Sequence, residues 1–149
     1  MSALNTKMRI FFLGSPSATI LASALLTLSA CSPTPPSTRS PIPLSDTSGD
    51  PSAGAEAFKT YCGQCHELTP GLNRRAPNLK GIYGSKAGSL DDYEYSAQIK
   101  QSGLLWNEKN LIRYMMRPKK MFSDTKMLVD QFPDDTQAKD IVAFLANHP

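Results

Sequence analysis

The sequence predicts an all-α domain at the C-terminal end of the chain, preceded by a disordered tether rich in proline and serine. Residues 53–149 place apolar side chains at helical spacing and show no alternating strand pattern. By contrast, six of the 12 prolines lie between Pro33 and Pro51. We therefore divide the 149 residues into residues 1–30, residues 31–52 and residues 53–149.

Three helices are expected in the folded part. The polar residues placed to cap their N-termini are Asp50, Asn107 and Asp134 or Asp135. Pro51 suits the first turn of the first helix, and Pro118 ends the second. The last helix has an apolar stripe formed by Ala138, Ile141, Val142 and Leu145. The glycine-rich stretch 70–88 is long for so small a domain, so something other than regular structure should organise it.

Residues 1–30 have the pattern of an export signal. Lys7 and Arg9 precede an apolar run from Ile20 to Ala30. The run ends in Leu28-Ser29-Ala30-Cys31, which resembles the bacterial lipobox. This resemblance implies that Cys31 is lipidated and becomes the mature N-terminus. The alternative is a transmembrane anchor over residues 10–30, but Gly14-Ser15-Pro16-Ser17 interrupts it. Both interpretations place the remainder on the periplasmic side, attached to a membrane.

The segment that follows is expected to be a linker. Residues 32–52 contain six Pro, six Ser and three Thr, and too few apolar side chains to offset the entropy of ordering. We therefore expect it to remain unfolded and to act as a passive spacer or as a tether that lets the domain reach membrane partners.

Charge and cysteine content exclude two classes of protein. The formal charge of +3 is too small to indicate a nucleic-acid partner. Residues 53–149 alone hold 13 basic and 11 acidic side chains, so the domain is nearly neutral. Three cysteines do not make a disulfide scaffold.

One motif indicates a cofactor. Cys62-Gly63-Gln64-Cys65-His66 is the c-type haem attachment pattern, in which two thiols bind the haem vinyl groups and the histidine binds the iron. A thioredoxin-type pair would need a βαβ context, and a structural zinc site would need four ligands. Only His148 is available besides the motif's own residues. We expect one covalently attached haem c.

The residues alone do not identify the second axial ligand of the iron. A methionine thioether is the expected donor. Met115 and Met116 lie inside a predicted helix, where a core role is favoured. Met121 and Met127 both follow Pro118 in a predicted loop, and spacing does not choose between them.

Residues 54–147 resemble a class I cytochrome c of the mitochondrial type. The matching pieces are Gly54, Phe58, Ala76-Pro77-Asn78-Leu79, Gly81-Ile82-Tyr83-Gly84, Lys86-Ala87-Gly88, Tyr93-Glu94-Tyr95-Ser96, Trp106, Tyr114, Pro118-Lys119-Lys120, Thr125-Lys126-Met127 and Ile141-Val142-Ala143-Phe144-Leu145. The resemblance implies a small single-haem fold in which the N- and C-terminal helices cross, with Gly54 and Phe58 against Phe144. It also implies that the protein transfers single electrons and is not an enzyme.

The resemblance assigns further roles residue by residue. Met127 would be the axial ligand, whereas Met121 would be a core residue. Pro77 would accept a hydrogen bond from His66. Tyr95 and Trp106 would bind one haem propionate and Thr125 would lie near the other, with Tyr114 near the Met127 sulfur. For each aromatic residue, plain core packing is the alternative.

The chain departs from the family at several positions. Ser85 stands where the family has an arginine near a propionate, which predicts a lower reduction potential. Ile99 replaces an asparagine and should make the pocket drier. Ser123-Asp124 and Val129 alter the loop that holds Met127.

The expected function is that of a membrane-tethered monohaem c-type cytochrome that exchanges electrons with membrane or periplasmic redox proteins, such as a respiratory complex, an oxidase or a dehydrogenase. Basic residues near the predicted haem edge favour acidic partners, although a mixed solvated surface is the alternative. No small-molecule substrate is expected. The alternatives are a haem peroxidase or gas-binding protein, if Met127 leaves the iron, and an electron-accepting subunit of a periplasmic dehydrogenase.

Overall fold

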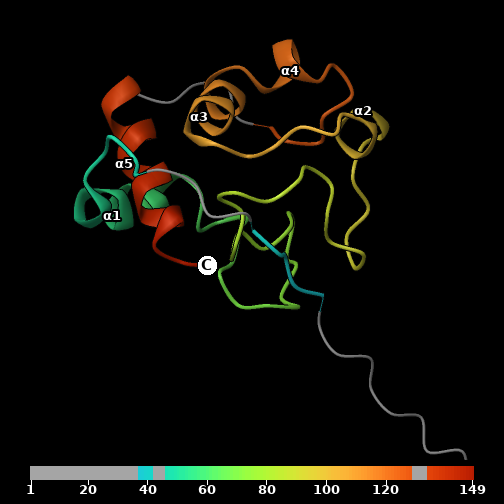
Figure 1. Cartoon of the computed structure of the whole chain (residues 1–149), viewed down its shortest axis with the longest axis horizontal. Helices are drawn as coiled ribbons and strands as arrows, with labels where there is room; N and C mark the ends of the chain where they lie inside the picture. Colours follow the sequence, from blue (N-terminus) through green and yellow to red (C-terminus); the bar gives the residue numbers. More distant parts are fainter. Residues whose placement is uncertain (1–36, 42–45, 129–133) are drawn as a thin grey trace, which may run out of the picture. The chain divides into compact units, whose positions relative to one another are not determined.

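The computed structural model describes residues 37–41, 46–128 and 134–149, all within one compact unit, Thr34–Pro149. Its helices are α1 (Pro51–Tyr61), α2 (Ala97–Gln101), α3 (Glu108–Met116), α4 (Pro118–Met121) and α5 (Asp135–Ala146), as Figure 1 shows. The described residues contain no strand, and one isolated bridge pairs Lys86 with Leu105. The predicted all-α fold is confirmed.

Some expectations concern residues outside those described. They include the signal segment, Cys31 and Val129. Within the described ranges, no helix is long and apolar enough to cross a membrane.

All three predicted helix starts are present. The Asp50 carboxylate accepts from the Ser52 amide at 2.8 Å, and the Asn107 side chain accepts from the Asn110 amide at 2.9 Å. Asp134, rather than Asp135, is the cap of α5. The short helices α2 and α4 were not expected, because four or five residues are too few for apolar periodicity to show.

The terminal helices cross as the resemblance implies. Gly54 of α1 lies against α5, where a Cβ atom on this glycine would be 1.9 Å from the Asp140 carbonyl oxygen. Phe58 packs on Phe144 with ring centroids 5.3 Å apart. The centre of α5 is fully buried: Ala138, Ile141 and Val142 have no exposed surface. This contact fixes the end of α1, from which the haem motif begins.

Backbone hydrogen bonds organise the glycine-rich stretch. Ala87 N–H donates to Leu104 at 2.8 Å, and the Trp106 N–H donates to Ser85 at 2.8 Å. The Gly81 N–H donates to His148 near the C-terminus at 2.8 Å. The long irregular segment is therefore held by residues that precede α3 and follow α5.

Part of the linker is bound to the domain. Ser37 donates to Asp92 at 2.8 Å, and both the amide and the hydroxyl of Ser48 donate to Glu108, at 2.7 and 2.6 Å. The Asp50 amide donates to Asp140 at 2.8 Å. The prediction that residues 32–52 remain unfolded is therefore wrong for residues 37–41 and 46–52, because these bonds and helix α1 order them.

Candidate haem site

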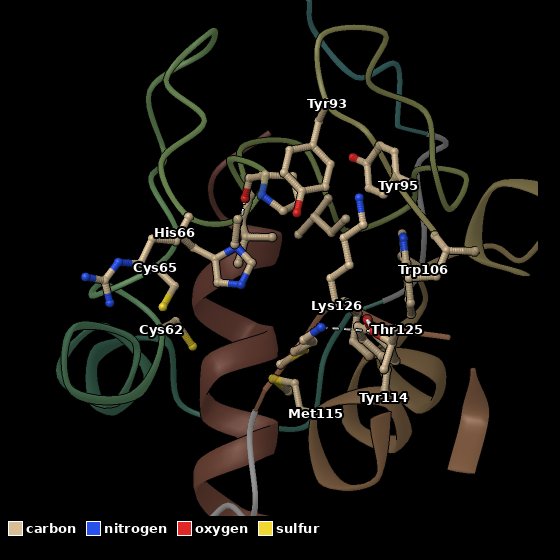
Figure 2. A pocket seen from close by; sticks show the side chains of 18 of the residues that line it. Cys62, Cys65, His66, Tyr93, Tyr95, Trp106, Tyr114, Met115, Thr125 and Lys126 are labelled. Atoms are coloured by element: carbon tan, nitrogen blue, oxygen red, sulfur yellow. Dashed lines mark hydrogen bonds between the residues drawn. The ribbon is translucent and has the colours of Figure 1, made fainter. Parts of the chain in front are cut away.

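A cavity of about 640 Å³ opens beside the end of α1, within the usual size range for cofactor sites. Its walls come from residues far apart in the sequence, and they are predominantly apolar. Figure 2 shows Cys62, Cys65 and His66 on one side, and Tyr114, Met115 and Thr125 on the other. The structure thus brings together residues that the sequence placed in separate motifs.

The haem motif follows α1 in a tight turn. Cys62 is the C-cap of α1, and the amides of Cys65 and His66 donate to the Cys62 carbonyl at 3.0 and 2.9 Å. Both thiols are free and both line the cavity. Burial and the nearby Cys65 raise the pKa of the Cys62 thiol to about 12. A reactive disulfide-exchange cysteine needs a lowered pKa and an accessible sulfur, so the burial of Cys62 disfavours the thioredoxin alternative.

The His66 ring is oriented by its own backbone neighbourhood. Its Nδ1 lies 2.7 Å from the Pro77 carbonyl, the hydrogen bond that the resemblance implies. A carbonyl only accepts, so Nδ1 carries the proton and Nε2 has a free lone pair. Burial lowers the pKa of His66, although the Pro77 bond opposes this shift. The imidazole is therefore neutral and points into the cavity (Figure 2), where Nε2 could bind a metal.

Two methionines line the cavity, Met127 and Met115, whereas Met121 packs against the core outside it. The sequence favoured a core role for Met115. In the structure Met115 is 6% exposed, as a core residue would be, and it also lines the cavity. His148 is not among the cavity residues, and its Nδ1 lies 2.7 Å from the Phe144 carbonyl.

A chain of hydrogen bonds supports Met127. The Met127 amide donates to the Thr125 hydroxyl oxygen at 3.2 Å, and that hydroxyl also bonds the Tyr114 hydroxyl. Tyr114 packs between Trp106 and Phe122, with centroids 5.1 and 5.7 Å away. Burial raises the pKa of Tyr114, so its hydroxyl stays protonated and keeps its bonding capacity.

The unusual Ser123-Asp124 pair has a structural partner in α2. The Ser123 amide donates to the Gln98 side chain at 2.8 Å, and that side chain donates back to the Ser123 hydroxyl at 2.9 Å. The Asp124 carboxylate accepts from the Gln98 amide at 2.9 Å. These three bonds hold the loop that leads to Met127. No local sequence pattern predicts these bonds, because Gln98 is 25 residues from Ser123.

A residue that sequence analysis missed lies at the Tyr95 edge of the cavity. Arg39, from the linker, is 9% exposed and lines the cavity together with Tyr95 and Trp106. Its only sequence signal is that it is a lone cation in a segment of Pro, Ser and Thr. Ser85, which replaces the arginine of the family, does not line the cavity, and its hydroxyl donates to the Ile82 carbonyl at 2.8 Å.

These residues fit a haem. Two thiols and a neutral imidazole are adjacent on one wall, a thioether faces them, and apolar residues such as Ile82, Ile99 and Leu111 line the space between. At one edge the buried Nε of Arg39 has no hydrogen-bond partner among the described residues. A ligand with one polar, anionic edge and an otherwise apolar body suits this arrangement.

Fold and site together define a small helical haem protein of the covalently attached type. The family model described as cytochrome c matches residues 51–149. The chain is 41% identical over 98 residues to cytochrome c of Theileria annulata, covering 65% of this chain and 84% of that protein. It is 40% identical to cytochrome c of Cochliobolus lunatus, covering 65% and 91%.

A solved structure gives the same answer. Cytochrome cH from Methylobacterium extorquens superposes with a TM-score of 0.61 at 38% identity, covering 66% of this chain and 99% of that chain. The chain belongs to the cytochrome c family. The expected class I fold is confirmed, and with it one covalently attached haem c and a role in electron transfer.

Proposed function

We propose that this protein is a membrane-tethered, monohaem electron carrier in which His66 and Met127 fill both axial positions of the iron. The observation that supports this proposal is the placement of His66 and Met127 in one cavity of haem size. The haem supplies the one-electron chemistry when bound. Cys62 and Cys65 would attach it, and Tyr95, Trp106 and Thr125 would line its polar edges.

The residues of this chain mainly fix the ligands and exclude water. Pro77 holds the His66 ring in one tautomer, and the Thr125 hydroxyl holds the Met127 backbone. Ile99, which is 7% exposed, lines the cavity and keeps it apolar, as the sequence indicated. If His66 and Met127 hold the iron as proposed, no position on the metal would be open to a substrate, so we do not propose an enzymatic activity.

In the wild-type holoprotein, protein side chains should therefore occupy both axial positions of the iron. We expect the oxidised form to have the methionine-to-iron absorption near the red end of the visible spectrum. The reduced form should fail to bind carbon monoxide at neutral pH, because a protein ligand occupies the sixth position. A spectrum without this absorption, together with rapid carbon monoxide binding, would support the peroxidase or gas-binding alternative instead.

The surface beside Met127 suits a transient redox partner. A shallow groove of about 290 Å³ there is lined by Lys119, Lys120, Met127 and Leu128, among others. Leu128 is 85% exposed, an unusual exposure for so apolar a side chain. An exposed apolar side chain beside lysines favours brief encounters with an acidic protein, because the lysine charges attract it. We propose a respiratory complex, an oxidase or a dehydrogenase as the class of partner.

Membrane attachment on the periplasmic side is proposed from residues 1–31. The lipobox-like Leu28-Ser29-Ala30-Cys31 supports cleavage before Cys31 and acylation of its thiol. A diacylglyceryl group adds two acyl chains, and stable anchoring needs about two, since each buried CH₂ contributes about 0.8 kcal/mol.

Mass spectrometry of the protein isolated from membranes tests this attachment. We expect a chain that begins at Cys31, one haem and one set of acyl groups. In the variant Cys31→Ser the acyl mass should be lost and the protein should leave the membrane fraction. A mature chain that retains Met1 would instead support the N-terminal transmembrane anchor.

A further inference from the structure

We propose that Arg39, a residue of the linker, pairs with a haem propionate and so replaces the arginine that the family carries at the position of Ser85. The linker segment 37–41 is then part of the haem pocket. In Figure 1 this segment, drawn in cyan, lies beside the loop that follows the haem motif. The inference rests on the proposed haem attachment and adds a residue to it.

Arg39 is held in place by neutral groups only. One terminal nitrogen, Nη1, donates to the Lys80 carbonyl at 2.9 Å and, more weakly, to the Asn78 side chain at 3.4 Å. The other, Nη2, donates to the Tyr95 hydroxyl oxygen at 3.3 Å. The buried Nε has no partner, and none of the ion pairs among the described residues includes Arg39.

A buried cation in this position needs an anion. Burial lowers the pKa of Arg39, yet a guanidinium does not lose its proton in proteins. The free-energy cost of burying the charge must therefore be offset by an opposite charge nearby. The charge of Asp92 acts on Arg39 only from a distance, because Asp92 is exposed and forms no ion pair with Arg39.

The position of Arg39 indicates which anion this would be. Arg39 lines the cavity beside Tyr95 and Trp106, the two residues that would bind a propionate. Two other cations line the same cavity, Arg75 and Lys126, but both are exposed, and Lys126 pairs with Glu94 at 3.3 Å. Arg39 is therefore the one buried cation that faces the cavity among the described residues.

The backbone around Arg39 leaves room for this contact. Gly81 has φ +65°, and a Cβ atom there would be 3.4 Å from the Arg39 Cβ and 3.9 Å from the Pro41 ring. The positive φ favours glycine at this turn, and the linker lies at van der Waals distance from it. Ser37 holds the segment on one side of Arg39 through its bond to Asp92.

The expectation from Ser85 changes as a result. A missing arginine predicted a lower reduction potential than in relatives that carry it. A cation supplied by Arg39 restores the compensation, because a positive charge near the haem disfavours the ferric state. We therefore expect the potential of this protein to be like that of the arginine-bearing relatives.

Redox titration of full-length holoprotein variants tests the pairing. In Arg39→Gln the potential should fall, with the ferric-to-ferrous ratio at a fixed potential rising about two- to tenfold. Arg74→Gln is the matched control, because Arg74 is exposed and pairs with Glu67 at 2.7 Å.

Trypsin gives a second readout, independent of the potential. Arg39 is the only lysine or arginine between Arg9 and Lys59. Its burial should protect the bond between Arg39 and Ser40 in the native holoprotein. Arg39→Lys keeps the charge and the cleavage site but loses the planar fork, so this variant should be cut faster.

The outcomes distinguish a failure of the Arg39–propionate pairing from a failure of the proposed haem attachment. If Arg39→Gln shifts the potential no more than Arg74→Gln does, Arg39 is a structural contact and the pairing is wrong. Rapid cleavage of the wild type at Arg39 would also overturn it, because the side chain would then not be buried in solution. A protein with no covalent haem spectrum would instead refute the haem attachment on which the inference rests.

Discussion

Replacing Met127 by leucine should remove the methionine-to-iron absorption, lower the reduction potential by on the order of 100 mV, and let the ferrous protein bind carbon monoxide. The reason is that leucine has no donor atom for the iron. Met127 lines the same cavity as the haem motif. Visible absorption and redox titration of the purified holoprotein measure all three effects.

The chain provides two matched controls for Met127. Met115 also lines the cavity, and Met121 packs against the core outside it. Met115→Leu and Met121→Leu should both retain the absorption band, since exchanging methionine and leucine costs less than about 1.5 kcal/mol. If Met115→Leu loses the band and Met127→Leu keeps it, then Met115 is the ligand and the assignment from family resemblance is wrong.

Replacing Gly54 by alanine should destabilise the protein by about 3 kcal/mol or more. The reason is that the added methyl group would clash with backbone atoms, which cannot move aside as a flexible side chain can. The added Cβ would lie 1.9 Å from the Asp140 carbonyl oxygen and 2.8 Å from the Phe144 Cβ. Helices α1 and α5 would have to separate. Denaturant unfolding of the holoprotein, followed by far-UV circular dichroism, measures the loss.

Gly103 provides the control for Gly54. It has φ +61°, and a Cβ atom there would meet nothing within 4 Å. Gly103→Ala therefore imposes backbone strain without a clash, which costs about 1–2 kcal/mol. An equal or larger loss in Gly103→Ala than in Gly54→Ala would contradict the close helix crossing.

The features that sequence analysis predicted depend on local patterns. Asp50, Asn107 and Asp134 cap helices because their side chains reach amides two or three residues away. The haem motif occupies five consecutive residues, so its geometry follows from one turn of chain. The helix crossing was available only through the family resemblance, which supplied the partner of Gly54.

The features that were missed depend on contacts between distant residues. Arg39 bonds to Tyr95, 56 residues away, and no periodicity in the linker indicates that contact. The same holds for Gln98 and Ser123, whose mutual bonds brace the Met127 loop. Composition described the linker as a whole, whereas its contacts with the domain come from individual residues such as Ser37, Arg39 and Ser48.

If Cys31 carries the proposed lipid anchor, the binding of Ser37 and Arg39 to the domain would limit how far the haem can lie from the bilayer. Only the six peptide steps from Cys31 to Ser37 remain between the proposed lipid anchor and the first bound residue. A fully extended chain spans at most about 3.3–3.6 Å per residue, so these six steps can bridge no more than about 20 Å. By comparison, an entirely free linker of 21 residues could reach about 65 Å. The domain would therefore remain within about one protein diameter of the membrane surface. Such confinement raises the local concentration of the carrier at integral membrane partners and restricts exchange with distant soluble ones.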